Sequence, residues 1–285
     1  MSVDLAAAVD LFDRSLRQIS DSDLERPWAW GQYDEEGIRF AFFRTLEELT
    51  DLAVEVAARR EEAGRPIGRA ARLVGRYHVA WRELWSIVDG AGESLLDAVP
   101  AAGEWPLRTV LEHLVGADLG FLVAQRNAAE RRAAGLAPAR AGDAWERLAG
   151  TPETEFERIF MGPLDAILAE HTRVHDGVLE LARLTDDELA SESAFWDGTM
   201  PNRFRLGRFE SHLRQHTIQV EKTIEAIAGP PREVDRLLLL IRRAQGEAES
   251  AAIGAEDVLQ QSGAAVAPGI AARSDELVAL TGVSA

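Results

Sequence analysis

Apolar residues recur every three or four positions along most of the chain, which is the spacing of one face of an α-helix. The pattern predicts a first helix through Leu5, Val9, Phe12 and Leu16 and a second over about residues 37–63. Further helices are expected over about 67–98, 106–133, 155–184 and 204–228, with one or two more in the tail. No sustained two-residue alternation of strand type is present. The predicted fold class is therefore all-α.

The helices expected between residues 67 and 228 can be arranged as a four-helix bundle. Short links suit antiparallel neighbours, whereas residues 134–154, with two prolines and three glycines, suit a long crossover. We therefore expect residues 1–66 to be an N-terminal helical extension packed on the bundle, 67–229 to be the bundle, and 230–285 to be a C-terminal helical tail. Either extension could wall a pocket, cover an apolar face or form a homodimer contact.

Two interruptions mark the second half of the expected bundle. The Gly162-Pro163 pair predicts either a kink in the helix over 155–184 or a later true start. The Trp196-Asp197-Gly198 segment predicts a turn before the last bundle helix.

The composition narrows the classes of partner. A net charge of −17 argues against nucleic acid, because binding a phosphate backbone needs a clustered basic surface. No membrane partner is expected, because the longest apolar candidate, residues 237–241, is far shorter than the roughly 18–20 residues that span a bilayer. The N-terminus lacks the basic region of a secretory signal. The chain has no cysteine, which excludes disulfides and thiolate ligands and agrees with a cytoplasmic protein.

The six histidines are the main candidates for chemistry, because four of them form two H-x-x-x-H pairs. Chance placement of six histidines in this chain gives about 0.12 such pairs. Residues four apart in a helix lie about 6 Å apart along the axis and about 40° apart around it, so two imidazoles can reach one ion. Each pair is either a set of metal ligands or a pair of hydrogen-bonded structural histidines.

His212 and His216 form the better candidate pair. They lie on the flank of an apolar stripe made by Leu206, Phe209, Leu213, Val220, Ile224 and Ile227. Gln219 continues the same polar edge. His113 lies on the edge of a second apolar stripe, where a lone histidine is more often a core residue than a ligand. With His212 and His216 it would make a three-histidine site with an open fourth position, as in catalytic zinc sites.

His171 and His175 fall in the centre of an apolar stripe. Two neutral imidazoles there need partners or incur a desolvation cost of roughly a few kcal/mol. They could be a rival ligand pair, a general base facing the same pocket, or a buried hydrogen-bonding pair. We take both as candidate catalytic residues. His78 lies in an aromatic stripe that is most simply core, and it is assigned no chemistry.

Two motifs resemble those of the DinB-like superfamily of metal-binding four-helix bundles. EWPLRTVLEHLVGAD is similar to the family's second-helix motif of a tryptophan, a helix start and a histidine, and RFRLGRFESHLRQHTIQVEKTI is similar to its fourth-helix H-x-x-x-H motif. The resemblance covers roughly residues 67–228. It implies that His113, His212 and His216 bind a divalent ion, commonly zinc or nickel. Gln219 stands where many members have a glutamine three residues after the last ligand.

The resemblance also implies an activity. Several members, including relatives of maleylpyruvate isomerase, transfer or isomerise small electrophiles with mycothiol or bacillithiol, holding the cofactor's thiolate on the metal. We therefore expect a metal-dependent enzyme that acts on a small-molecule substrate with a low-molecular-weight thiol, with His171 or His175 moving a proton. The alternatives are a metal-dependent hydrolase and a non-catalytic, ligand-binding or stress-associated bundle protein.

Overall fold

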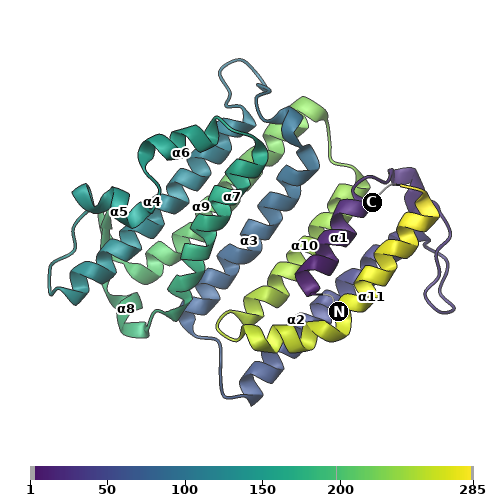
Figure 1. The fold of residues 1–285 in the computed structure, drawn as a ribbon, viewed down its shortest axis with the longest axis horizontal. Helices are drawn as coiled ribbons and strands as arrows, with labels where there is room; N and C mark the ends of the chain where they lie inside the picture. Colours follow the sequence, from purple (N-terminus) through teal and green to yellow (C-terminus); the bar gives the residue numbers. More distant parts are fainter. Residues whose placement is uncertain (1–3, 197, 284–285) are drawn as a thin grey trace. The chain divides into compact units, whose positions relative to one another are not determined.

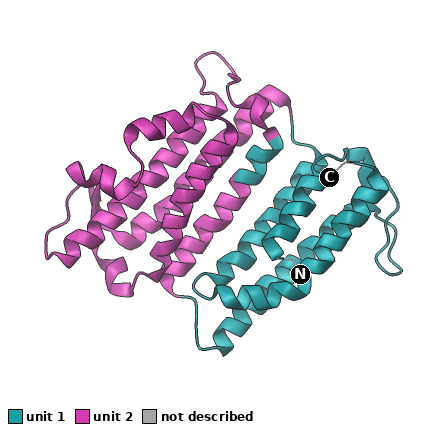
Figure 2. Ribbon diagram, viewed as in Figure 1, with its two compact units in different colours: residues 1–67, 85–90, 230–285 teal, residues 68–84, 91–229 magenta. Residues whose placement is uncertain are grey.

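The chain folds almost wholly into helices, which confirms the all-α prediction (Figure 1). The computed structural model describes residues 4–196 and 198–283. Contacts divide the chain into two compact units: residues 1–67, 85–90 and 230–285 form the first, and residues 68–84 and 91–229 form the second (Figure 2). All six histidines lie in the second unit. Within the described residues, no helix has the length and apolar character needed to cross a bilayer.

Four long helices form the second unit, as expected for a four-helix bundle. They are α3 (Arg69–Ala91), α4 (Leu107–Ala133), α7 (Leu164–Glu180) and α9 (Asn202–Ala228). Helix α4 packs along both α7 and α9. The ring of Tyr77 on α3 lies 5.5 Å from that of Phe209 on α9, and both side chains are fully buried. Residues 85–90 of α3 belong to the first unit.

The start of α7 is set by a proline and a carboxylate. Pro163 precedes the helix, where its missing N–H removes no helical hydrogen bond. The next N–H, that of Leu164, donates to Oε2 of Glu93 at 2.8 Å, so a side chain satisfies one of the free N–H groups of the helix end. Gly162-Pro163 is therefore a true helix start. Of the two alternatives, a kink and a later start, the later start is confirmed: the segment forms α6 (Glu153–Phe160), α7 and η4 (Leu181–Arg183).

Short elements fill the remaining links of the second unit. They are η2 (Glu93–Leu95), η3 (Gly142–Ala144), α5 (Trp145–Ala149), α8 (Asp186–Ala190), β1 (Glu192–Phe195) and β2 (Gly198–Pro201). The strands β1 and β2 form an antiparallel hairpin in which Phe195 lies opposite Gly198. The periodicity does not predict this hairpin, because a four-residue strand is too short to show alternation. Asp197, in the middle of the expected turn, lies outside the described residues.

The first unit brings together the two ends of the chain. Its elements are α1 (Leu5–Leu16), η1 (Asp21–Glu25), α2 (Ile38–Glu62), α10 (Glu233–Ala252) and α11 (Glu256–Thr281). Helix α10 packs along α2, and α11 packs along α1 and α2 around a core of its own. The guanidinium of Arg242 is buried there and donates to the carboxylates of Asp10 and Asp13. That residues 1–66 pack on the bundle stays a prediction.

Candidate metal centre

Three histidines from two neighbouring helices converge in the second unit. His113 belongs to α4, and His212 and His216 stand on successive turns of α9. One ring nitrogen of each lies within 4.8 Å of the other two. The ring centroids are 4.4 Å apart for His212–His216, 4.6 Å for His113–His216 and 5.3 Å for His113–His212. Three imidazoles this close can share one ion.

The apolar stripes of α4 and α9 produce this convergence. Leu213 and Val220 are fully buried on α9, and Leu114 is fully buried on α4. Burying these stripes against the bundle fixes the rotation of each helix about its axis, and α4 packs along α9. The histidines on the flanks of the two stripes are thereby turned towards each other, so local periodicity determines a contact between residues a hundred positions apart.

The hydrogen bonding of His212 and His216 indicates which of their ring nitrogens could bind an ion. Nδ1 of His216 lies 2.9 Å from Oε1 of Gln219. Because an amide oxygen can only accept, Nδ1 carries the proton and Nε2 presents its lone pair. Nδ1 of His212 is buried and has no hydrogen-bond partner in the part of the chain that the structure describes. Buried nitrogens are normally satisfied, so this atom is suited to bind a group other than the protein.

The surroundings keep two of the three imidazoles neutral. Burial, the neighbouring His216 and the positive charge of Arg208 lower the pKa of His212 to about 3. Burial and His216 also lower the pKa of His113 below its usual 6.5. A histidine must be neutral to ligate a metal ion. His113 and His212 are therefore neutral, as binding of a metal ion requires.

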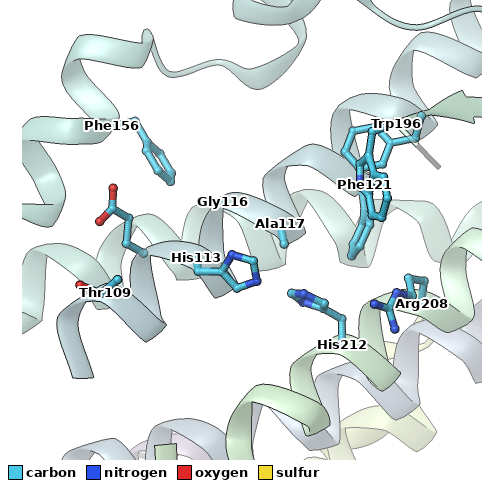
Figure 3. Close-up of a pocket in the computed structure, with 11 residues that line it drawn as sticks. Thr109, His113, Gly116, Ala117, Phe121, Phe156, Trp196, Arg208 and His212 are labelled. Carbon is cyan, nitrogen blue, oxygen red and sulfur yellow. The ribbon is translucent and has the colours of Figure 1, made fainter. Parts of the chain in front are cut away.

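A pocket of about 570 Å³ opens beside the histidines (Figure 3). Its lining consists of Thr109, Glu112, His113, Gly116, Ala117, Phe121, Phe156, Phe195, Trp196, Arg208 and His212. In the view of Figure 3, Phe156 lies on one side of the two labelled histidines and Trp196 on the other. Two of the three histidines, His113 and His212, thus line a pocket flanked by aromatic side chains, which a small molecule can enter.

Gly120 of α4 makes room for Phe195 in the aromatic wall of the pocket. A Cβ at Gly120 would lie 2.8 Å from Cζ of Phe195, closer than real Cβ contacts allow. A Cβ at Gly116 would lie an ordinary 3.6 Å from Cζ of Phe156. The hairpin is also tied to the crossover, because Arg140 donates to the carbonyl oxygens of Phe195 and Trp196 at 3.2 and 3.0 Å. The contacts between the crossover and the hairpin therefore help to position Phe195 and Trp196.

Comparison with known protein families identifies the family of the helical bundle in the second unit. A model of the DinB superfamily matches residues 76–220, about half of the chain, and the match includes all three convergent histidines. The chain belongs to the DinB superfamily. Comparison with curated proteins and comparison with solved structures each found no match. In this DinB superfamily member the matched segment begins in α3 and ends in α9, so residues 1–67 and 230–285 lie outside it.

The other three histidines of this DinB superfamily member belong to a buried polar network. Nε2 of His171 lies 3.1 Å from Oδ2 of Asp118, and the hydroxyl of Tyr77 donates to the same oxygen at 2.8 Å. Nε2 of His175 lies 2.9 Å from Nδ1 of His78. Neither His171 nor His175 lines the pocket, and neither belongs to the described group of potential metal ligands. A proton-transfer role for these two residues stays a prediction.

Burial dominates the electrostatics of this network. It lowers the pKa of His175 well below 6.5, and the nearby His78, His171 and Arg82 lower it further. Burial raises the pKa of the Asp118 carboxyl, against the opposing effect of its hydrogen bonds to His171 and Tyr77. The ring of His175 also stacks on Trp81, with centroids 4.3 Å apart. The imidazole of His175 is therefore held neutral and fixed in orientation.

The sequence reasoning missed most of the pocket wall. Phe121, Phe156, Phe195 and Trp196 come from three separate parts of this DinB superfamily chain, and nothing in their local pattern links them. The sequence did indicate a place for Arg208 near the site, because it stands one turn before His212 on the same helix face. The turn predicted at Trp196-Asp197-Gly198 places Phe195 and Trp196 beside a turn, but it does not indicate which helix they face.

Proposed function

We propose that this protein is a metal-dependent enzyme in which His113, His212 and His216 bind a divalent ion, zinc or nickel. One observation carries the proposal: three imidazoles converge beside an open pocket, and no fourth protein ligand joins their group among the described residues. Structural zinc sites are closed by four protein ligands, whereas catalytic sites keep one position for a small molecule. The arrangement supports the catalytic type.

The donor set fits such an ion. Imidazole nitrogens suit zinc and nickel. Gln219 would hold His216 with Nε2 exposed, and the buried Nδ1 of His212 has no protein partner in the described residues. The lowered pKa values of His113 and His212 keep both rings ready to bind at neutral pH.

The reaction that we propose is transfer or isomerisation of a small electrophile with a low-molecular-weight thiol of the mycothiol type. The chain has no cysteine, so the thiol is a separate molecule. A bound divalent ion would lower the pKa of that thiol. The aromatic wall would exclude water from the electrophile, and Arg208 would bind an anionic group. Support for the thiol comes from the two sequence motifs, and support for the ion comes from the site.

Elemental analysis of the purified, untagged full chain tests the metal. We expect about one equivalent of zinc or nickel, lost in the His216→Ala variant, with helical content by circular dichroism unchanged. Gln215→Ala is the matched control, because Gln215 precedes His216 on α9 and is exposed. Retention of metal in both His216→Ala and His212→Ala would overturn the ligand assignment. Absence of metal after reloading would overturn the enzyme proposal in favour of a binding protein.

Thiol dependence tests the reaction. The metal-loaded protein is mixed with a halogenated bimane and with mycothiol, bacillithiol or no thiol, and the conjugate is measured by fluorescence. Turnover that needs both a thiol and His216 supports the proposal. Ester hydrolysis that needs His216 but no thiol would overturn the thiol step and favour a metal-dependent hydrolase, in which the ion activates water.

A further inference from the structure

The pocket wall is rich in aromatic side chains. Four of its side chains, Phe121, Phe156, Phe195 and Trp196, are aromatic, and Trp196 is 69% exposed. The Phe121–Phe195 and Phe195–Trp196 ring centroids are 5.6 and 6.5 Å apart, each within the range of edge-on aromatic packing. Such a wall offers ring faces and edges to a flat guest, and exposed aromatics rimming a pocket mark binding sites.

One guanidinium lines the same pocket without an acidic partner. Arg208 is half-buried, and among residues 4–196 and 198–283 no carboxylate forms an ion pair with it. Its hydrogen bond to Oγ of Ser211 is long, at 3.5 Å. Some arginines of the bundle do have such partners: Arg76 and Arg214 both pair with Glu210. A partly desolvated, unpaired guanidinium favours an anion, and its planar shape matches a carboxylate.

The position of Arg208 beside the histidines strengthens this reading. Arg208 stands one turn before His212, and Figure 3 shows the two side chains next to each other at the pocket. A divalent ion on the histidines would repel the guanidinium, and an anion bound between them would relieve that repulsion. Glu112 also lines the pocket but forms no ion pair with Arg208 in the described chain. The carboxylate and the guanidinium are therefore two separate charged groups of the pocket.

We propose that the pocket binds an aromatic carboxylate, with its ring against Phe156, Phe195 and Trp196 and its carboxylate on Arg208. This assignment names the substrate class of the proposed enzyme and rests on that proposed function for its catalytic meaning. The binding itself needs only the pocket and Arg208. It can therefore be measured whether or not an ion is bound.

Calorimetric titration of the full chain with three probes tests the proposal. The probes are 2-naphthoate, the neutral isostere 2-naphthamide, and the non-aromatic hexanoate. We expect 2-naphthoate to bind at least tenfold more tightly than either of the others. Equal affinity for the acid and the amide would overturn the role of charge, and equal affinity for naphthoate and hexanoate would overturn the role of the aromatic wall.

Variants assign the preference to residues. Arg208→Gln should remove the preference of acid over amide and leave the amide affinity within about twofold, while Arg208→Lys should keep part of the preference. Arg203→Gln is the control, since Arg203 stands on the same helix outside this pocket. Phe195→Ala should weaken both naphthalene probes alike. Helical content is checked for each variant, and an unchanged preference in a folded Arg208→Gln protein would overturn the assignment.

Metal-stripped protein and the His216→Ala variant separate this inference from the proposed function. A preference that survives in both and still depends on Arg208 supports the assignment, even if elemental analysis finds no metal. A preference that requires the ion and survives in Arg208→Gln means that the ion holds the carboxylate. That result would overturn the role of Arg208 while the metal site stands.

Discussion

Oε1 of Gln219 lies 2.9 Å from Nδ1 of His216, one turn further along α9. The amide oxygen selects the tautomer with the proton on Nδ1, fixes the ring plane and leaves the lone pair of Nε2 available. Partners of this kind contribute to a metal site although they never touch the ion.

Gln219→Leu should weaken metal binding by about 10–100-fold, because the ring of His216 loses its orienting partner. Titration against a chelating dye measures the affinity. Gln215→Leu, an exposed change on the same helix, should leave it unaltered. Equal affinities for the two variants would contradict the orienting role.

His171→Ala should keep a full equivalent of metal but lower the free energy of unfolding by about 1–3 kcal/mol, because the buried Asp118 loses one of its two hydrogen-bond donors. Elemental analysis and urea unfolding measure the two effects. Loss of metal in this variant would show that the ligand set is wrong. If His171 moves a proton, the metal-loaded variant loses turnover as well.

The buried network predicts a pH dependence of stability. The folded-state pKa of His175 lies well below 6.5, so between that pKa and 6.5 the unfolded chain binds a proton that the folded chain does not. This contribution to stability is present above pH 6.5 and is lost as the pH falls below it, by at most about 1.4 kcal/mol per pH unit. Urea unfolding of wild type and His175→Gln at pH 7.5, 6.5 and 5.5 tests this. Comparison with the variant cancels the other titrating groups, and parallel pH profiles would contradict the prediction.

Gly120→Ala should displace the ring of Phe195, whose Cζ would lie 2.8 Å from the new Cβ, and weaken 2-naphthoate binding by about tenfold or more. Gly207→Ala is the control, because Gly207 is a helical glycine outside the pocket and its Cβ would meet no atom within 4 Å. Calorimetry measures both, and both variants should retain metal. Similar loss in the two variants would show that the position of Phe195 does not control the pocket.

The convergence of His113, His212 and His216 could be predicted because its information is local. His212 and His216 are one helical turn apart, and His113 lies on the edge of its own stripe, so periodicity alone turns all three towards a neighbouring helix. The helices of the bundle were predictable for the same reason. Only the break before Leu164 was ambiguous, since a Gly-Pro pair can bend a helix or begin one.

The pocket and the buried network could not be predicted in this way. His171 and His175 occupy a stripe that the sequence places in the core, but their partners Asp118 and His78 come from other helices. The contact between Phe195 and Gly120 depends on a hairpin of two four-residue strands. Pairings of this kind depend on the tertiary arrangement, and a single sequence carries no periodic signal for them.

Arg140 lies in the crossover and holds the hairpin by two backbone carbonyls, whereas the three histidines lie on the long helices α4 and α9. The aromatic side chains of the hairpin, Phe195 and Trp196, thus lie on a different segment from the histidines and from Arg208, which is on α9. Insertions or substitutions in the crossover can reshape the entrance of the pocket while the helical register of the three histidines stays intact. The aromatic side of the pocket and the histidine cluster could therefore change independently of each other.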